Sequence, residues 1–361
     1  MLMQVFWIAI GLVLLVAGAD ALVRGASRLA LSFGISPLVV GLTVVAFGTS
    51  APEMAVSVGA ARSGSVDIAI GNVVGSNIFN VLFILGAATL VAPLVVNAQL
   101  IRQEVPVMIA ASALLFLLCA DGGISRVDGF VLFGLLLGYT AFLVVQSRRQ
   151  TSATRAEYAE AVEIRAGEEG GRSRAVDVAY VIGGLALLVL GARTLVDAAV
   201  TIAAHLGVPE LIVGLTIVAA GTSLPEVATS VMATIRGERD IAVGNVVGSN
   251  TFNILGVLGV SSLVAPGDLP VTPSVLAFDL PVMTAVAVAC LPVFFTGRTI
   301  ARWEGIVFLG YYAAYTAYLI LATQRHEATE AFSDAMLGFV LPITVLTLAA
   351  SLAGELKARR R

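Results

Sequence analysis

Charged residues are scarce in this chain: they make up 12% of its 361 residues, against 58% hydrophobic residues. Soluble domains carry about a quarter charged residues, so this composition excludes an ordinary soluble protein. The net charge of -3, with no basic cluster outside short loops, argues against a nucleic-acid partner. Only two cysteines occur, Cys119 and Cys290, both in apolar segments and without disulfide or metal spacing. We expect both thiols to be buried side chains within the membrane.

Apolar segments of about 20 residues, the length that crosses a bilayer, follow one another along the chain. The first starts at Val5 without a basic leader or a cleavage site, so we expect a retained span and not a signal peptide. The sequence therefore predicts an all-α polytopic membrane protein. The predicted spans cover residues 5 to 23, 36 to 61, 67 to 91, 103 to 120, 128 to 146, 176 to 204, 209 to 235, 240 to 265, 276 to 295, 302 to 321 and 336 to 354.

The distribution of basic residues predicts the orientation of these eleven spans. With the N-terminus outside, the cytoplasmic side receives 17 of the 21 lysines and arginines, as the positive-inside rule requires. The polar, mixed-charge segment 147–175 then becomes a cytoplasmic linker, and the C-terminal KARRR also lies inside. We expect a first five-helix repeat at 1–146, a second at 176–321, and an extra transmembrane helix with a basic tail at 322–361, in the cell inner membrane.

The two halves are copies of each other. Aligning Gly41–Gly86 with Gly214–Gly259 gives 30 identities in 46 positions. Each copy holds five spans, and an odd number places the second copy upside down relative to the first. Inverted repeats of this kind are characteristic of secondary transporters.

Each copy carries two motifs that we expect to interrupt a helix near the membrane midplane. In GTSAPE and GTSLPE, Pro52 and Pro225 lack an N–H donor and clash with the preceding turn. In GNVVGSN, which occurs at 71–77 and 244–250, glycines permit close backbone approach while Asn and Ser supply oxygens. Irregular polar backbone at that depth is tolerated only where it lines a polar cavity.

The candidate ligands are all oxygens, which favours hard cations such as calcium or sodium and disfavours zinc or copper. Inverted symmetry brings Glu53 and Glu226 face to face with a combined charge of minus two. One divalent cation neutralises that pair, whereas in its absence the pair takes protons or several monovalent cations. Such competition is the thermodynamic basis of antiport.

The motifs GTSAPE, GNVVGSNIFN, GTSLPE and GNVVGSNTFN resemble the alpha-repeats of the calcium/cation antiporter superfamily, specifically its prokaryotic sodium/calcium exchanger branch. The resemblance implies alternating access, with the first and sixth spans sliding across a fixed core. It also implies a metal site in which Glu53 and Glu226 are shared ligands of calcium and sodium. The further ligands that it implies are Thr49, Ser50, Thr222, Ser223, Ser76 and Ser249, with the carbonyls of Ala46 and Ala219.

Two features depart from the family pattern. Asn80 and Asn253 stand where some relatives place an aspartate in one copy, which makes potassium co-transport less expected and leaves two carboxylates in the site. We include both asparagines among the ligands. The eleventh span has no counterpart in the usual ten-span core.

The roles of several polar residues stay open from sequence. Asn72, Asn77, Asn245 and Asn250 either bond between helices or contact the ion. Asp20 and Arg24, four residues apart, either neutralise each other within the first span or act in gating.

We expect a secondary antiporter that exchanges calcium for sodium at a two-glutamate cage, with no cofactor. No ATP-binding motif is present, so a pump or another enzyme is not expected. Two alternatives remain: an antiporter on the same fold that exchanges calcium or manganese for protons, and, from another class, a cation channel. Oligomeric state is left open.

Overall fold

The computed structural model describes residues 2–33, 35–149, 174–206, 219–324, 326 and 328–359. Within these ranges nine helices are long and apolar enough to cross a membrane, or ten if one bent pair forms a single span. The predicted span at 209–235 is described only from residue 219, where the short apolar helix Leu224–Ile235 lies. The helical, multi-pass fold expected from the sequence is confirmed.

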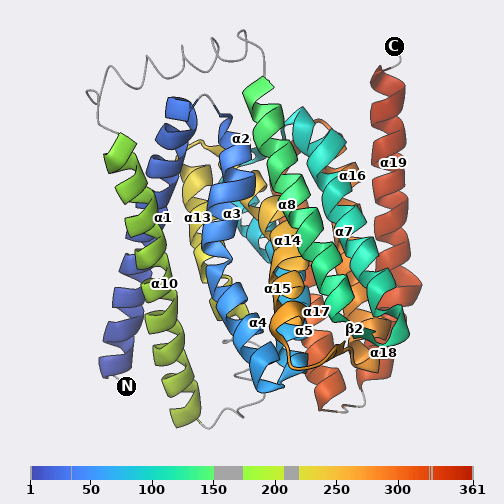
Figure 1. The fold of residues 1–361 in the computed structure, drawn as a ribbon. Coiled ribbons are helices and arrows are strands. Elements are labelled where there is room, and N and C mark those ends of the chain that lie inside the picture. Colours follow the sequence, from blue (N-terminus) through green and yellow to red (C-terminus); the bar gives the residue numbers. More distant parts are fainter. Residues whose placement is uncertain are drawn as a thin grey trace.

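The first repeat begins with one long helix and continues through shorter, bent ones (Figure 1). Its elements are α1 (Leu2–Phe33), α2 (Pro37–Val40), η1 (Gly41–Val45), α3 (Ala46–Thr49), α4 (Ala51–Ser63), α5 (Val66–Phe79), η2 (Asn80–Leu85), α6 (Gly86–Val91), β1 (Leu94–Val95), η3 (Leu100–Glu104), α7 (Val105–Leu118), η4 (Cys119–Asp121), β2 (Gly123–Ile124) and α8 (Arg126–Arg149).

The second repeat, where it is described, follows a similar order of elements, and one further helical span comes after it. The elements are α10 (Arg174–His205), α12 (Ala219–Thr222), α13 (Leu224–Ile235), α14 (Arg239–Phe252), η6 (Asn253–Leu258), α15 (Gly259–Val264), β3 (Leu269–Pro270), η7 (Val275–Asp279), α16 (Leu280–Phe295), β4 (Thr299–Ile300), α17 (Arg302–Thr323), α18 (Ala328–Ala335), η8 (Met336–Val340) and α19 (Leu341–Arg359).

Short strand pairs tie the repeats together at opposite ends of the bundle. At one end β1 pairs antiparallel with β4, and at the other end β2 pairs antiparallel with β3. The N-terminus and the C-terminus also lie at opposite ends (Figure 1). Each pair joins a loop of one repeat to a loop of the other, as two inverted copies require.

The second-motif helices form the centre of the bundle. In the most apolar 18-residue stretch of the span 239–264 every residue is buried, and in that of the span 66–91 72% of the residues are buried. In contrast, only 17% of the most apolar stretch of α8 and 11% of that of α17 are buried, and the stretch of the C-terminal span 328–354 has no buried residue. The polar motif is therefore surrounded by apolar helices, and the extra helix is peripheral.

Helices α1 and α10 form an antiparallel pair that stands at the side of this core (Figure 1). Glycines at seven-residue spacing bring the two backbones together. A Cβ atom added at Gly18 would lie 2.8 Å from the carbonyl oxygen of Gly184, and one at Gly11 would lie 2.9 Å from that of Gly191. Such close packing of small residues is typical of helix pairs in membranes.

The first expected helix interruption is confirmed. The axis of 37–49 bends by 47° relative to that of 51–63, and the chain turns at Ser50, directly before Pro52 in the first turn of α4. In the second repeat α12 ends at Thr222 and α13 begins at Leu224, with Pro225 in its first turn. Proline is tolerated there because the first-turn N–H groups have no intrahelical partner.

The second expected interruption is wrong: the helix runs unbroken through GNVVGSN in both repeats. The polar side chains of this motif bond to other helices and leave their own backbone ladder intact. The irregularity comes directly after it, in the π-helical segments η2 and η6, which begin at Asn80 and Asn253. The expected close approach does occur, because a Cβ atom at Gly248 would lie 2.7 Å from the Leu42 carbonyl oxygen.

The division into repeats, linker and terminal segment stays a prediction, and most of the linker lies outside the described residues. The terminal segment packs beside α16 and α17, where the Tyr311 hydroxyl bonds to Thr344 of α19.

Candidate cation site

The two motif glutamates lie at the bends of α3–α4 and α12–α13. Glu53 and Glu226 each occupy the first turn of the second helix, and both side chains are fully buried. The proline before each of them stands in the first turn of the helix, and each carboxylate meets a serine of the opposite repeat. The free N–H groups of a helix start favour negative charge at this position.

Serines cross between the repeats to meet these carboxylates. Ser50 donates to Glu226 Oε1 at 3.0 Å, and Ser223 donates to Glu53 Oε1 at 2.8 Å. Ser223 Oγ also lies 3.2 Å from Ser76 Oγ. Each acid is thus bonded by the other repeat, which brings together five predicted site residues that are far apart in sequence.

The threonines of the first motif bond to asparagines of the opposite repeat. Thr49 donates to Asn245 Oδ1 at 3.1 Å, and Thr222 donates to Asn72 Oδ1 at 3.4 Å. Thr49 Oγ1 also lies 3.4 Å from the Ala46 carbonyl, which accepts the Ser50 N–H at 3.0 Å. The Ala46 carbonyl is therefore part of the helix ladder and keeps one lone pair for another contact.

The amide nitrogens of Asn72 and Asn245 bond within their own repeat. Asn72 Nδ2 donates to the Glu53 carbonyl at 3.2 Å and to Ser57 at 2.9 Å. Asn245 Nδ2 makes the equivalent bonds to the Glu226 carbonyl and Ser230. Since both ends of each side chain are bonded to protein groups, these two residues join the bent helices to their neighbours.

Several buried oxygens of this cluster have no hydrogen-bond partner among the described residues. They come in pairs related by the repeat, apart from one serine. They are Glu53 Oε2, Glu226 Oε2, Asn80 Oδ1, Asn253 Oδ1 and Ser249 Oγ. A buried acceptor without a partner costs about 1–3 kcal/mol, so a set of five points to a ligand that supplies positive charge. Calcium and sodium bind oxygens of these types.

Comparison with known proteins identifies the family of this chain. The family described as "Sodium/calcium exchanger protein" matches residues 3–145 and 176–321. The chain belongs to the sodium/calcium exchanger family.

Three similar proteins align with most of this chain. The sodium/calcium exchanger MaX1 of Methanosarcina acetivorans is 34% identical over 86% of this chain and 96% of its own length. The inner membrane protein YrbG of Escherichia coli K12 is 42% identical over 74% of this chain and 81% of its own. A solved structure of the sodium-calcium exchanger NCX_Mj, soaked with zero Na⁺ and Ca²⁺, matches 88% of this chain and 99% of its own, at 31% identity and a TM-score of 0.75. The family to which the chain belongs consists of transporters and not of enzymes.

One buried hydroxyl of the exchanger was not predicted from the sequence. Thr229 lies one turn after Glu226, is fully buried, and has no hydrogen-bond partner for Oγ1 among the described residues. Its repeat counterpart is Val56 and it lies outside the motifs that carry the family resemblance, so neither the repeat nor the motifs pointed to it.

Two further acids, one buried and one half-buried, lie outside the cluster. Glu104 accepts hydrogen bonds from the Tyr139 hydroxyl at 2.5 Å and from Gln99 at 2.9 Å. At the equivalent place in the second repeat, Asp279 accepts from the Tyr315 hydroxyl at 2.8 Å. These carboxylates fasten neighbouring helices to each other.

The charged pair of the first span extends to a second helix. Asp20 lies 3.0 Å from Arg24, four residues on, and also bonds to Arg236 at the end of α13. Nearby, Ser27 of α1 donates to Glu238 at 3.0 Å. Asp20 thus links α1 to the loop between α13 and α14, and it also neutralises Arg24 on its own helix.

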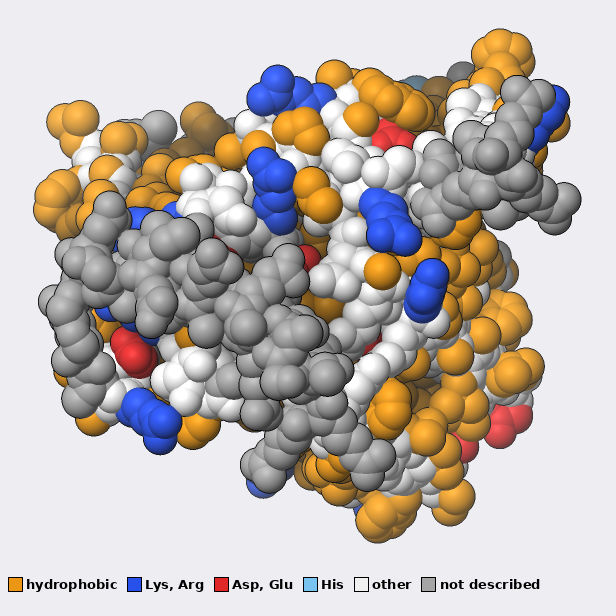
Figure 2. Space-filling model, turned by 90° about the horizontal axis from the view of Figure 1, so that it is seen from above, with side chains coloured by type: hydrophobic (Ala, Val, Ile, Leu, Met, Phe, Trp, Pro, Cys, Tyr) orange, Lys and Arg blue, Asp and Glu red, His pale blue; other side chains and the backbone are white. Residues whose placement is uncertain are grey.

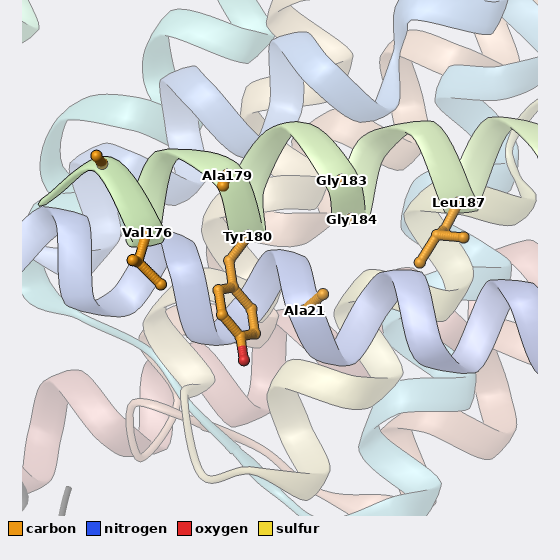
Figure 3. A pocket seen from close by; sticks show the side chains of 8 residues that line it. Ala21, Val176, Ala179, Tyr180, Gly183, Gly184 and Leu187 are labelled. Atoms are coloured by element: carbon orange, nitrogen blue, oxygen red, sulfur yellow. The ribbon is translucent and has the colours of Figure 1, made fainter. Parts of the chain in front are cut away.

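Two cavities lie away from the buried cluster. One, of about 330 Å³, is lined by Asn97, Glu238 and Asp240 at the end that carries β1. The other, of about 460 Å³, is an apolar groove between α1 and α10, lined by alanines, glycines and Tyr180 (Figure 3). Neither includes a predicted ligand.

Proposed function

We propose that this exchanger moves calcium in one direction and sodium in the other, at one site formed by Glu53 and Glu226. The set of five unpartnered buried oxygens carries this proposal, because two of them are the carboxylates and the other three are neutral hard ligands. The proposed ligands are those predicted from the sequence: Glu53, Glu226, Thr49, Ser50, Thr222, Ser223, Ser76, Ser249, Asn80, Asn253, Ala46 and Ala219.

The charge of the site accounts for the exchange. Within the described residues no group of three histidine, cysteine, aspartate or glutamate side chains gathers, so the cage has two carboxylates. Calcium neutralises both, whereas a single sodium ion leaves one uncompensated, and two buried like charges repel strongly. Several sodium ions therefore replace one calcium ion, and the two occupancies exclude each other.

The α1–α10 pair is the proposed moving part. The backbones of the two helices contact each other at glycines, and only 22% of the residues in the most apolar 18-residue stretch of α1 are buried. A pair that holds together tightly and faces lipid along its length can slide as a unit over the core, which alternating access requires.

We propose that the exchanger lies in the cell inner membrane, with the N-terminus outside and both the linker and the C-terminus in the cytoplasm. Lysine and arginine side chains are spread over the end that carries β1 and the C-terminus, seen from above in Figure 2. The arginines exposed near this end include Arg102, Arg236, Arg239, Arg298 and Arg302. This distribution matches the positive-inside rule.

Calcium uptake into sodium-loaded proteoliposomes tests the proposal. We expect uptake on dilution into choline buffer, none on dilution into sodium buffer, and loss of uptake in Glu53→Gln and in Glu226→Gln. The matched control is Asp279→Asn, because its amide oxygen still accepts the Tyr315 hydrogen bond outside the cage; this variant should keep uptake.

The competing hypothesis is proton coupling, since two adjacent glutamates also bind protons. Uptake that follows an imposed pH gradient and ignores sodium would establish it and refute sodium exchange. Calcium current without coupling to any gradient would instead indicate a channel.

A further inference from the structure

Four asparagines are joined by hydrogen bonds between the two repeats at the centre of the exchanger. The reciprocal bonds of Asn77 and Asn250 close a ring to which Asn80 and Asn253 bond, and the set of four is called the asparagine ring. Asn77 and Asn80 lie on the span of α5 and η2, and Asn250 and Asn253 lie on that of α14 and η6. All four side chains are buried, with at most 2% of any of them exposed. Two of the unpartnered oxygens of the proposed cage belong to members of this ring.

The ring fixes which way each amide group points. Asn77 Nδ2 donates to the Asn250 backbone carbonyl at 3.2 Å, and Asn250 Nδ2 donates to the Asn77 carbonyl, also at 3.2 Å. A backbone carbonyl only accepts hydrogen bonds, so each of these side chains must present its nitrogen there and its Oδ1 elsewhere.

Those two oxygens then orient the remaining asparagines. Asn253 Nδ2 donates to Asn77 Oδ1 at 3.1 Å, and Asn80 Nδ2 donates to Asn250 Oδ1 at 3.0 Å. With their NH₂ groups engaged, Asn253 and Asn80 keep Oδ1 as the free end. The orientation of both amides therefore follows from two backbone carbonyls, through Asn77 and Asn250.

Asn80 and Asn253 lie on the helix faces that carry the serines of the proposed cage. Asn80 follows Ser76 by four residues, and residues at this spacing share one helix face. Ser76 Oγ in turn contacts Ser223, which bonds to Glu53. Asn253 and Ser249 have the same relation in the second repeat, and Ser249 Oγ is also unpartnered.

We propose that Asn77 and Asn250 are positioning residues, which make Asn253 and Asn80 present oxygen and not NH₂ to the cation. This inference rests on the proposed function, since it concerns the same cage. An amide that turned over would direct a hydrogen-bond donor at a cation, which replaces attraction by repulsion. The pairing is crossed, so each repeat sets the polarity of a ligand in the other.

A purely structural role does not account for the ring. Asn72 and Asn245, the structural asparagines of the same motif, have their Oδ1 and Nδ2 atoms all bonded to protein groups. If the ring served only to join helices, its geometry would satisfy its own oxygens in the same way. Instead it leaves two acceptors open at symmetrical positions.

A double-mutant cycle tests the proposal. Calcium affinity is measured on the full chain in detergent, by equilibrium binding of radioactive calcium, for Asn77→Ala, Asn253→Ala and the double variant. We expect each single variant to weaken calcium binding roughly 10- to 100-fold, as loss of an orienting partner does at other metal sites. The double variant should bind about as weakly as Asn253→Ala alone, because Asn77 has nothing left to orient.

The comparison pair is Asn77→Ala with Asn80→Ala, in which the first residue does not orient the second. Here the two losses should multiply. Thermal unfolding of each variant shows whether it is folded, and a general packing role would lower the unfolding temperature without producing the specific coupling.

The outcomes separate this inference from the proposed function. If the wild-type exchanger binds no calcium, the proposed function is refuted, and the positioning role with it. If the wild type binds calcium but the losses of Asn77→Ala and Asn253→Ala multiply, the positioning role alone is overturned. The same holds if Asn77→Ala binds calcium within twofold of wild type while Asn253→Ala does not.

Discussion

The contact between α1 and α10 permits a sharp test with neighbouring glycines. A Cβ atom added at Gly184 would lie 2.6 Å from the Leu22 backbone nitrogen and 2.8 Å from the Gly18 carbonyl oxygen. Beside it on the same helix, a Cβ atom at Gly183 would meet no described atom within 4 Å apart from its chain neighbours and its own helix backbone. Both residues line the groove of Figure 3, but only Gly184 faces the other backbone.

The cost of Gly184→Ala follows from that distance. Ordinary van der Waals contact begins at 3.4 Å, so the Cβ atom is well inside contact distance and the two backbones must move apart at this point. Neither contacting atom belongs to a flexible side chain. Overpacking of this kind costs about 1–3 kcal/mol. Alanine is more favourable than glycine in a helix by about 1 kcal/mol. This gain in stability is the same for both variants, so it cancels when they are compared.

We therefore expect Gly184→Ala to be about 1–3 kcal/mol less stable than Gly183→Ala. The assay is thermal unfolding of the two purified variants in the same detergent, followed by light scattering or tryptophan fluorescence. Gly183→Ala should unfold at or above the wild-type temperature. If Gly184→Ala unfolds at or above the temperature of Gly183→Ala, the close backbone contact of α1 and α10 is refuted.

Three further results are expected. Ser223→Ala removes the hydrogen bond to Glu53 Oε1. Calcium affinity should fall about tenfold, which corresponds to the low end of the energy of a hydrogen bond to a charged group. An unchanged binding isotherm would contradict the arrangement in which each repeat bonds the acid of the other. Tyr315→Phe leaves Asp279 without its donor and should lower the unfolding temperature without changing sodium dependence; a shift in that dependence would place Asp279 in the transport path. Both cysteines are fully buried, so a maleimide should label the exchanger only after unfolding in SDS, and rapid labelling in the folded state would contradict the packing of their helices.

Much of this exchanger is determined locally and was therefore predictable. Long apolar segments have to be helices in a bilayer, because every backbone polar group needs a partner within its own segment. Proline in the first turn fixes the bend before Glu53 and Glu226, and the duplicated motifs make the two halves structural copies. These features depend on neighbours in the chain, so they can be read from it.

The bonding of the buried polar groups was decided only by the tertiary structure. The expected interruption at GNVVGSN is absent, because its asparagines and serines find partners on other helices and do not compete with their own backbone. The roles of Asn72 and Asn77, five residues apart in one motif, differ for the same reason: one has both ends bonded, and the other orients Asn253 across the repeat interface. The sequence supplies the oxygens, but which of them stay unpartnered depends on groups about 170 residues away, which only the packing of the inverted repeats brings within hydrogen-bonding distance.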